Sequence, residues 1–102
     1  MKLYVDDLRP APPGWELAKS SLEALAWLNL WRNNVETFNA LSLSHDLSGN
    51  ENTRPVILWM AQHNYWPKVL YLHATMESEG RQWIQHAADQ YAPDDMIRTW
   101  AA

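Results

Sequence analysis

Five side chains that are able to bind a metal ion or to transfer a proton stand at or directly after the ends of apolar, strand-like stretches of this sequence. They are Asp6, Asp7, His45, Asp46 and His73. Asp supplies the hard carboxylate oxygens that Mg²⁺ and Mn²⁺ prefer, and His titrates near neutral pH, which suits acid–base chemistry. The combination indicates a site for a phosphoryl group.

Asp6, Asp7 and Asp46 are the candidates for binding a metal ion. Three carboxylates at one edge of a sheet repel each other unless something positive lies between them. A Mg²⁺ or Mn²⁺ ion is the natural partner, because both ions keep coordination positions for water and substrate phosphate. The alternative is that Asp6 or Asp7 pairs with Arg9 or caps a turn.

The two histidines are candidates for the general base and the general acid of a reaction on a phosphoester. His45 and His73 would divide these roles, and Arg9 would stabilise the charge that develops. A variant of this mechanism uses Asp46 as a nucleophile and passes through an acyl phosphate. The alternative for each histidine is a structural role.

Three residues near the start of the last expected helix suit a phosphate group, namely Thr75, Ser78 and Arg81. Hydroxyl groups and the free backbone N–H groups of a helix N-terminus bind anions. The alternative is that Ser78 caps the helix and that Arg81 is an ordinary surface residue.

The elements that position these residues follow from propensity and periodicity. Strands are expected at 2–5, 15–20 (a weak one), 40–44 and 68–73. Helices are expected at 21–34, 55–64 and 78–91. Ser20 and Glu23 have the spacing of a capping box, and Pro55 fits the first turn of the second helix.

Strands that alternate with helices predict an α/β fold with a largely parallel sheet and right-handed crossovers. In such sheets, ligands bind beyond the carboxyl ends of the strands. We therefore expect one domain over residues 1–102, in which the five side chains converge on one site.

Composition narrows the function classes. The chain has 102 residues, a formal net charge of −4, seven Trp and no Cys, so it has room for one modest core and none for disulfides or zinc–thiolate sites. Scattered Lys and Arg argue against binding to duplex nucleic acid. No apolar run approaches the roughly 20 residues of a membrane span, so a cytoplasmic protein is expected. An exposed Trp patch that binds a protein partner is possible.

Three segments resemble a known family. They are YVDDLRPAPPGW (4–15), LSLSHDLSG (41–49) and YLHATMESEG (71–80). The acidic pair and the later Asp resemble the receiver domain of two-component signalling, and the whole set is more similar to the cyclic-phosphate processing receiver domain. This resemblance implies a small three-layer, flavodoxin-like domain with a short, mostly parallel sheet of four strands. It also implies an active-site set of Asp6, Asp7, Arg9, His45, Asp46 and His73.

The sequence departs from the family pattern at three positions. Ser44 replaces the first Asp of an Asp-His-Asp triplet, and this removes one carboxylate. Ala74 replaces the Ser that follows the later His, although Thr75 comes next. Lys68 begins a strand, whereas the Lys of an ordinary receiver ends one.

The first hypothesis for function is a metal-dependent phosphoesterase that processes a cyclic or small phosphodiester, such as a nucleotide or an RNA end. The alternative is a non-catalytic, receiver-like module that binds a nucleotide or a protein partner. A third interpretation is a phosphorelay receiver that accepts a phosphoryl group at Asp46.

Overall fold

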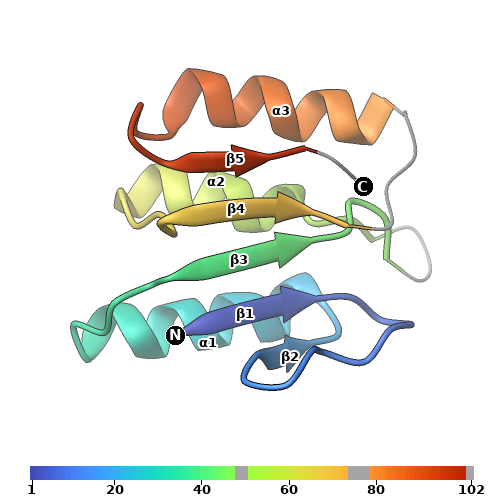
Figure 1. Ribbon diagram of the computed structural model, residues 1–102, viewed down its shortest axis with the longest axis vertical. Coiled ribbons are helices and arrows are strands. Elements are labelled where there is room, and N and C mark those ends of the chain that lie inside the picture. Colours follow the sequence, from blue (N-terminus) through green and yellow to red (C-terminus); the bar gives the residue numbers. More distant parts are fainter. Residues whose placement is uncertain (48–50, 74–78, 101–102) are drawn as a thin grey trace.

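The computed structural model describes residues 1–47, 51–73 and 79–100, in which five strands alternate with three helices (Figure 1). The strands are β1 (Lys2–Val5), β2 (Glu16–Ala18), β3 (Ala40–Leu43), β4 (Val69–Leu72) and β5 (Ile97–Thr99). The helices are α1 (Ser21–Asn33), α2 (Arg54–His63) and α3 (Glu79–Tyr91). Among the described residues, no helix is long and apolar enough to cross a membrane.

The strands form one parallel sheet in the order β2-β1-β3-β4-β5. The register sets Tyr4 of β1 beside Ser42 of β3, and Ser42 beside Tyr71 of β4. The chain moves outward from β1 to β2 and then returns past β1 to β3, which is the strand order of flavodoxin-like folds. The structure therefore confirms the predicted α/β, receiver-like fold.

The sheet has one strand more than the four that the sequence indicated. The backbone N–H of Ile97 donates to the carbonyl of Lys68 at 2.9 Å, and β5 then pairs with β4. A strand of three residues with Arg98 at its centre has too little apolar alternation to be recognised from sequence. The weak strand expected at 15–20 is present as β2.

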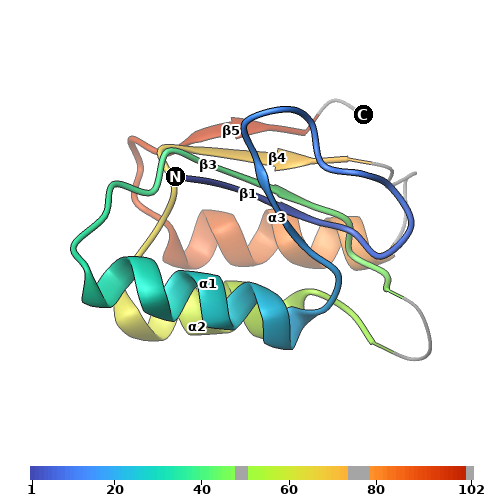
Figure 2. The ribbon, with the colours of Figure 1, turned by 90° about the horizontal axis from the view of Figure 1, so that it is seen from below.

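The expected three layers are corrected to two, because all three helices lie on one face of the sheet (Figure 2). The connections from β2 to β3, β3 to β4 and β4 to β5 all cross the sheet in the same direction. Right-handed crossovers in one direction place their helices on the same side. The opposite connection, from β1 to β2, contains three Pro and one Gly in residues 10–14, which prevent a helix.

The predicted helix signals are confirmed at both ends. The Ser20 hydroxyl caps α1 by accepting a hydrogen bond from the backbone N–H of Glu23 at 3.1 Å. Pro55 lies in the first turn of α2, where its missing N–H costs no helical hydrogen bond. The same helix ends at Asn64, whose φ of 49° is the left-handed conformation that Asn tolerates.

Alternate residues of the three central strands face the helices and form the core. Each of them is at most 2% exposed: Leu3, Val5, Leu41, Leu43, Leu70 and Leu72. They pack against apolar side chains of the three helices, including Leu28, Met60 and Ile84. The intervening residues of the same strands therefore point to the other face of the sheet, which we call the open face.

Six of the seven Trp lie in or against the core, and the seventh, Trp15, contacts Tyr4 and Tyr71 on the open face, so the expected exposed patch of several Trp is not found. Trp31 is buried beside Trp27 and Phe38, with ring centroids 5.5 and 5.8 Å away. The other six Trp are partly buried. Five of these six pack against the core, namely Trp27, Trp59, Trp66, Trp83 and Trp100. Large rings compensate for the modest number of core residues that a chain of this length supplies.

We expect adjacent residues of β4 to differ in their effect on stability, because they face opposite sides of the sheet. Leu70→Ala should lower the free energy of unfolding by about 2–5 kcal/mol, as is usual for a buried Leu. Tyr71→Ala should cost about 1 kcal/mol, since Tyr71 is 38% exposed and loses mainly ring contacts. Urea unfolding measures both values, and equal costs would contradict the two-layer arrangement.

Candidate functional site

Strand alternation divides the predicted site residues between the two faces of the sheet. Asp6 and His73 meet on the open face, where His73 Nε2 lies 2.9 Å from Asp6 Oδ2. His45 instead follows β3 on the helix-covered face. A Cβ built on Gly80 of α3 would lie 2.3 Å from its Nδ1. The predicted convergence is thus only partial, and the residues form two separate groups.

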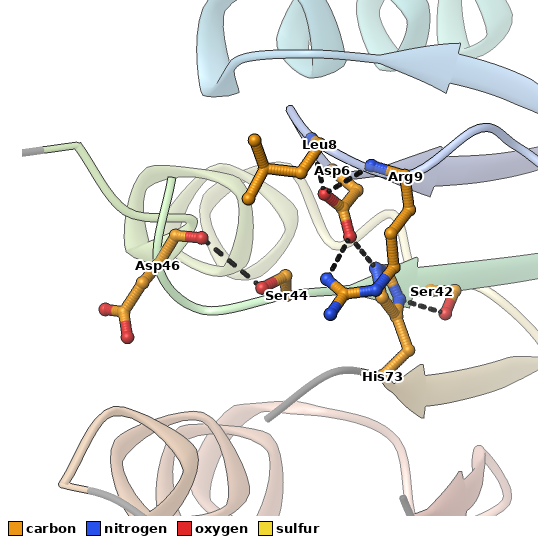
Figure 3. A network of polar contacts seen from close by, with 7 residues as sticks. All are labelled: Asp6, Leu8, Arg9, Ser42, Ser44, Asp46 and His73. Carbon is orange, nitrogen blue, oxygen red and sulfur yellow. Dashed lines mark hydrogen bonds and ion pairs between the residues drawn. The ribbon is translucent and has the colours of Figure 1, made fainter. Parts of the chain in front are cut away.

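The carboxylate of Asp6 is the centre of the open-face group (Figure 3). It is 2% exposed. Its Oδ1 accepts hydrogen bonds from the backbone N–H groups of Leu8 at 2.8 Å and Arg9 at 3.1 Å. Its Oδ2 accepts from Nη1 of Arg9 at 3.2 Å and from His73 at 2.9 Å. These four donors compensate the burial of a charge, and they fold residues 7–9 back over the carboxylate as an Asx-type turn.

His73 links Asp6 to Ser42. Its Nδ1 lies 2.6 Å from the Ser42 hydroxyl oxygen. An ionised carboxylate can only accept, so Nε2 carries the ring proton and Nδ1 accepts from the hydroxyl. The ring also stacks on Tyr4, with centroids 4.1 Å apart. Both ring nitrogens are therefore engaged, and the imidazole is fixed in position.

Two small side chains, one on β3 and one directly after it, allow this contact between non-adjacent strands. Asp6 follows β1 and His73 follows β4, and β3 lies between these strands. Ser42 and Ser44 point from β3 or its end toward the same face (Figure 3). Their small volume leaves the space in which carboxylate and imidazole meet. Ser44 is 8% exposed and brings no charge to this face.

Burial and hydrogen bonding determine the charges of this group. Burial by itself would raise the pKa of Asp6, but the hydrogen bonds from Leu8, Arg9 and His73 outweigh it and hold that pKa below its usual 3.8. Burial lowers the pKa of His73 below its usual 6.5 and outweighs the opposite effect of Asp6. At neutral pH the group is therefore a carboxylate, a neutral imidazole and a guanidinium.

The arrangement of Ser42, His73 and Asp6 has the residue types of a hydrolase triad. Ser42 is only 5% exposed, however, because it lies in the middle of a central strand. A substrate cannot reach its hydroxyl, so Ser42 acts as a positioning residue for the imidazole. Sequence reasoning overlooked Ser42, although a polar residue inside an apolar strand was the available signal.

His45 belongs to the helix-side group, together with Asp46 and Arg54. Its Nδ1 lies 2.7 Å from Oδ1 of Asp46, and its Nε2 accepts from Nε of Arg54 at 3.0 Å. The guanidinium can only donate, so Nδ1 carries the ring proton. The ring is 6% exposed and lies against Gly80, so it ties the end of β3 to α2 and α3. No spacing in the sequence indicated Arg54.

The carboxylates do not fit a Mg²⁺ or Mn²⁺ ion in this arrangement. Both oxygens of Asp6 are occupied by N–H donors, one of them the cationic Arg9. The Asp46 side chain is 82% exposed, and its carboxylate points away from Asp6 (Figure 3). Across residues 1–47, 51–73 and 79–100, no group of three or more His, Cys, Asp or Glu is placed to hold a metal.

The other predicted site residues are placed as follows. Asp7 is half-buried directly after Asp6, and Arg81 is half-buried in the first turn of α3. Thr75 and Ser78 lie outside the described residues. The predicted phosphate contacts of Thr75, Ser78 and Arg81 therefore stay predictions.

The family model described as the cyclic-phosphate processing receiver domain matches residues 1–90 of the chain. This range includes all residues of the open-face and helix-side groups. No curated protein and no solved structure matches the chain.

Because the negative charge of Asp6 raises the pKa of His73, Asp6→Asn should lower that pKa further. The titration of the His73 ring protons by NMR measures this change. Asp89→Asn is the matched control, since Asp89 is an exposed carboxylate on α3 that pairs with Arg98. An unchanged or raised His73 pKa in Asp6→Asn would contradict the described network.

The stability of the wild-type protein should fall as the pH falls from neutral to 5. The unfolded chain, in which the pKa of His73 is about 6.5, binds the proton more readily than the folded one. His73→Gln should remove part of this pH dependence in urea unfolding. The contribution of Asp6 is lost only at lower pH, below its usual pKa of 3.8.

A methyl group at Gly80 should destabilise the protein by about 1–3 kcal/mol, the usual cost of overpacking. The new Cβ would lie 2.3 Å from Nδ1 of His45. In a double-mutant cycle, Gly80→Ala should cost clearly less when His45 is already replaced by Ala. Equal costs in the two backgrounds would show that the imidazole does not pack against α3.

Proposed function

The chain belongs to the family of cyclic-phosphate processing receiver domains, and from that premise we propose that its open-face group binds a small cyclic phosphodiester, which is a nucleotide or an RNA end. The site lies at the carboxyl edge of the sheet, near the point between β1 and β3 where the strand order reverses. Ligands of open α/β sheets bind at this place.

The guanidinium of Arg9 is the observation that carries this proposal. Its side chain is 53% exposed, although Nη1 is held by Asp6 at 3.2 Å. Within the described residues, no hydrogen-bond partner is assigned to its Nη2 or Nε. A guanidinium that is fixed at one nitrogen and open at the others is prepared to donate to two phosphoryl oxygens.

Charge balance limits the affinity that we expect. Asp6 already neutralises Arg9, so a phosphodiester anion meets a hydrogen-bond donor rather than a net positive charge. Binding should therefore depend on the geometry of the donors and only weakly on salt. The imidazole of His73, on the same face, is neutral and adds no positive charge.

Hydrolysis of the cyclic phosphate is the second candidate, and the description of the family as cyclic-phosphate processing favours it. His73 is the imidazole on the same face as Arg9, so it is the better candidate for proton transfer than the buried His45. For this role the imidazole must leave the Ser42 hydroxyl and turn a ring nitrogen outward to the substrate or to water. Metal-dependent hydrolysis would further require that Asp6 release its N–H donors.

Arg9→Gln should weaken the binding of cyclic nucleotides by about tenfold. Charge-assisted hydrogen bonds contribute about 1.5–3 kcal/mol each, and exposure to solvent reduces this value. Phosphorus NMR titrations with 2′,3′- and 3′,5′-cyclic nucleotides measure the dissociation constants. Arg32→Gln, which removes an exposed cation from the last turn of α1, is the matched control.

The same spectra distinguish the two candidates, because opening of the ring gives a new phosphorus signal. They are recorded with Mg²⁺, with Mn²⁺ and with chelator. Ring opening that chelator abolishes would support a metal-dependent phosphoesterase. Line broadening without a new signal would support a binding module. Equal titrations for wild type and Arg9→Gln would contradict the site.

A further inference from the structure

Aromatic rings, rather than a second layer of helices, cover the open face of the sheet in the described part of the chain. Parallel sheets are usually covered by helices on both faces. Here the three helices occupy one face only (Figure 2). On the other face, Tyr4 and Tyr71 stand on β1 and β4, and Trp15 from the segment before β2 contacts both.

The aromatic set forms a continuous surface across three strands. Tyr4, Ser42 and Tyr71 are neighbours in register. The Trp15 ring meets the rings of Tyr4 and Tyr71 edge-on, with centroids 6.3 and 6.0 Å away. Trp15 thereby shelters Ser42, yet Tyr71 remains 38% exposed. Lys2 lies 5.7 Å from the Trp15 centroid.

This surface continues directly into the open-face polar group. Tyr71 lies on β4 and His73 directly follows this strand, two residues further on, which places their side chains on one face about 7 Å apart. Tyr4 stacks on the His73 ring, and His73 in turn holds Asp6, the partner of Arg9. Arg9 and the aromatic rings are thus connected through Asp6 and His73 on the same face of the sheet.

We propose that the open face is a base-binding subsite, in which the base of a nucleoside cyclic phosphate lies against Tyr71 and Trp15. This inference rests on the proposed function and adds the nucleoside to the ligand. Stacking on aromatic rings contributes about 1–3 kcal/mol per base and depends little on which base is present. The rings offer few hydrogen-bond groups for reading a base edge, so selectivity among bases should be weak.

The negative net charge of the chain favours a short ligand over a long nucleic acid. A formal charge of −4 and the scattered cations oppose a long polyanion. The subsite therefore suits a mononucleotide or the last nucleotide of a short RNA end.

The test compares two cyclic phosphates that differ only in the presence of a nucleoside. Adenosine 2′,3′-cyclic phosphate and the base-free glycerol 1,2-cyclic phosphate are titrated by phosphorus NMR into the whole chain. With wild type, the nucleotide should bind about 5- to 150-fold more tightly, as stacking of one base predicts. A trinucleotide that ends in a 2′,3′-cyclic phosphate is the third ligand. Tighter binding of the trinucleotide than of the mononucleotide would indicate that the ligand is an RNA end. Weaker binding of the trinucleotide would indicate a free mononucleotide.

Tyr71→Ala should remove most of the preference for the nucleotide and leave the affinity for the base-free compound unchanged. Tyr71→Leu, which keeps apolar volume without a ring, should behave in the same way and guards against a loss of folding. Tyr91→Ala is the matched control, because Tyr91 is 50% exposed on α3. Arg9→Gln should weaken both ligands equally.

Two results would overturn this inference while the proposed function stands. One is equal affinity of wild type for the two compounds, and the other is an unchanged preference in both Tyr71 variants. Absence of binding of either compound to wild type would overturn the proposed function, and with it the subsite.

Discussion

The buried carboxylate of Asp6 is the constraint on which the site depends. A charge that is 2% exposed is stable only when its oxygens are paired. Here two backbone N–H groups, a guanidinium and an imidazole supply the four donors. The carboxylate in this way determines the turn after β1, the position of Arg9 and the tautomer of His73. One of these donors, the guanidinium of Arg9, is also the group that we propose for the ligand.

The small residues of β3 decide which kind of site this carboxylate can form. Ser44 brings no carboxylate to this face, and Asp6 pairs with N–H donors of the protein. Asp46 lies beyond and points outward (Figure 3).

The fold was predictable from the sequence because each long element has its own signal. The capping pair of Ser20 and Glu23, the Pro55 helix start and the apolar β3 and β4 stretches each indicated one element. β5 was not predicted because a strand of three residues is too short to show the alternation of apolar and polar residues. The number of layers was predicted wrongly because it depends on which connections contain a helix. The Pro-rich segment is the connection from β1 to β2, and only the strand order shows that a helix there would cover the open face.

The site was predictable only as a set of strand ends. That Asp6 and His73 follow β1 and β4 was correct, and the parallel sheet brought them together. His45 was expected at the same place, but successive side chains of a strand alternate between the two faces of the sheet, and His45 points to the helix side. There it contacts Gly80 and Arg54. Ser42 contributes to the site through register, which a single sequence does not display.

Coverage of the sheet by helices on one side has a consequence for how such a domain diversifies. Odd and even positions of one strand serve different purposes: Leu70 holds the core together, and its neighbour Tyr71 faces outward. Substitutions at the outward positions can change what is recognised while the folded state is conserved. Selection for a new ligand and selection for stability then act on separate residues of the same four-residue strand, so related chains are free to keep this core and vary the rings in front of it.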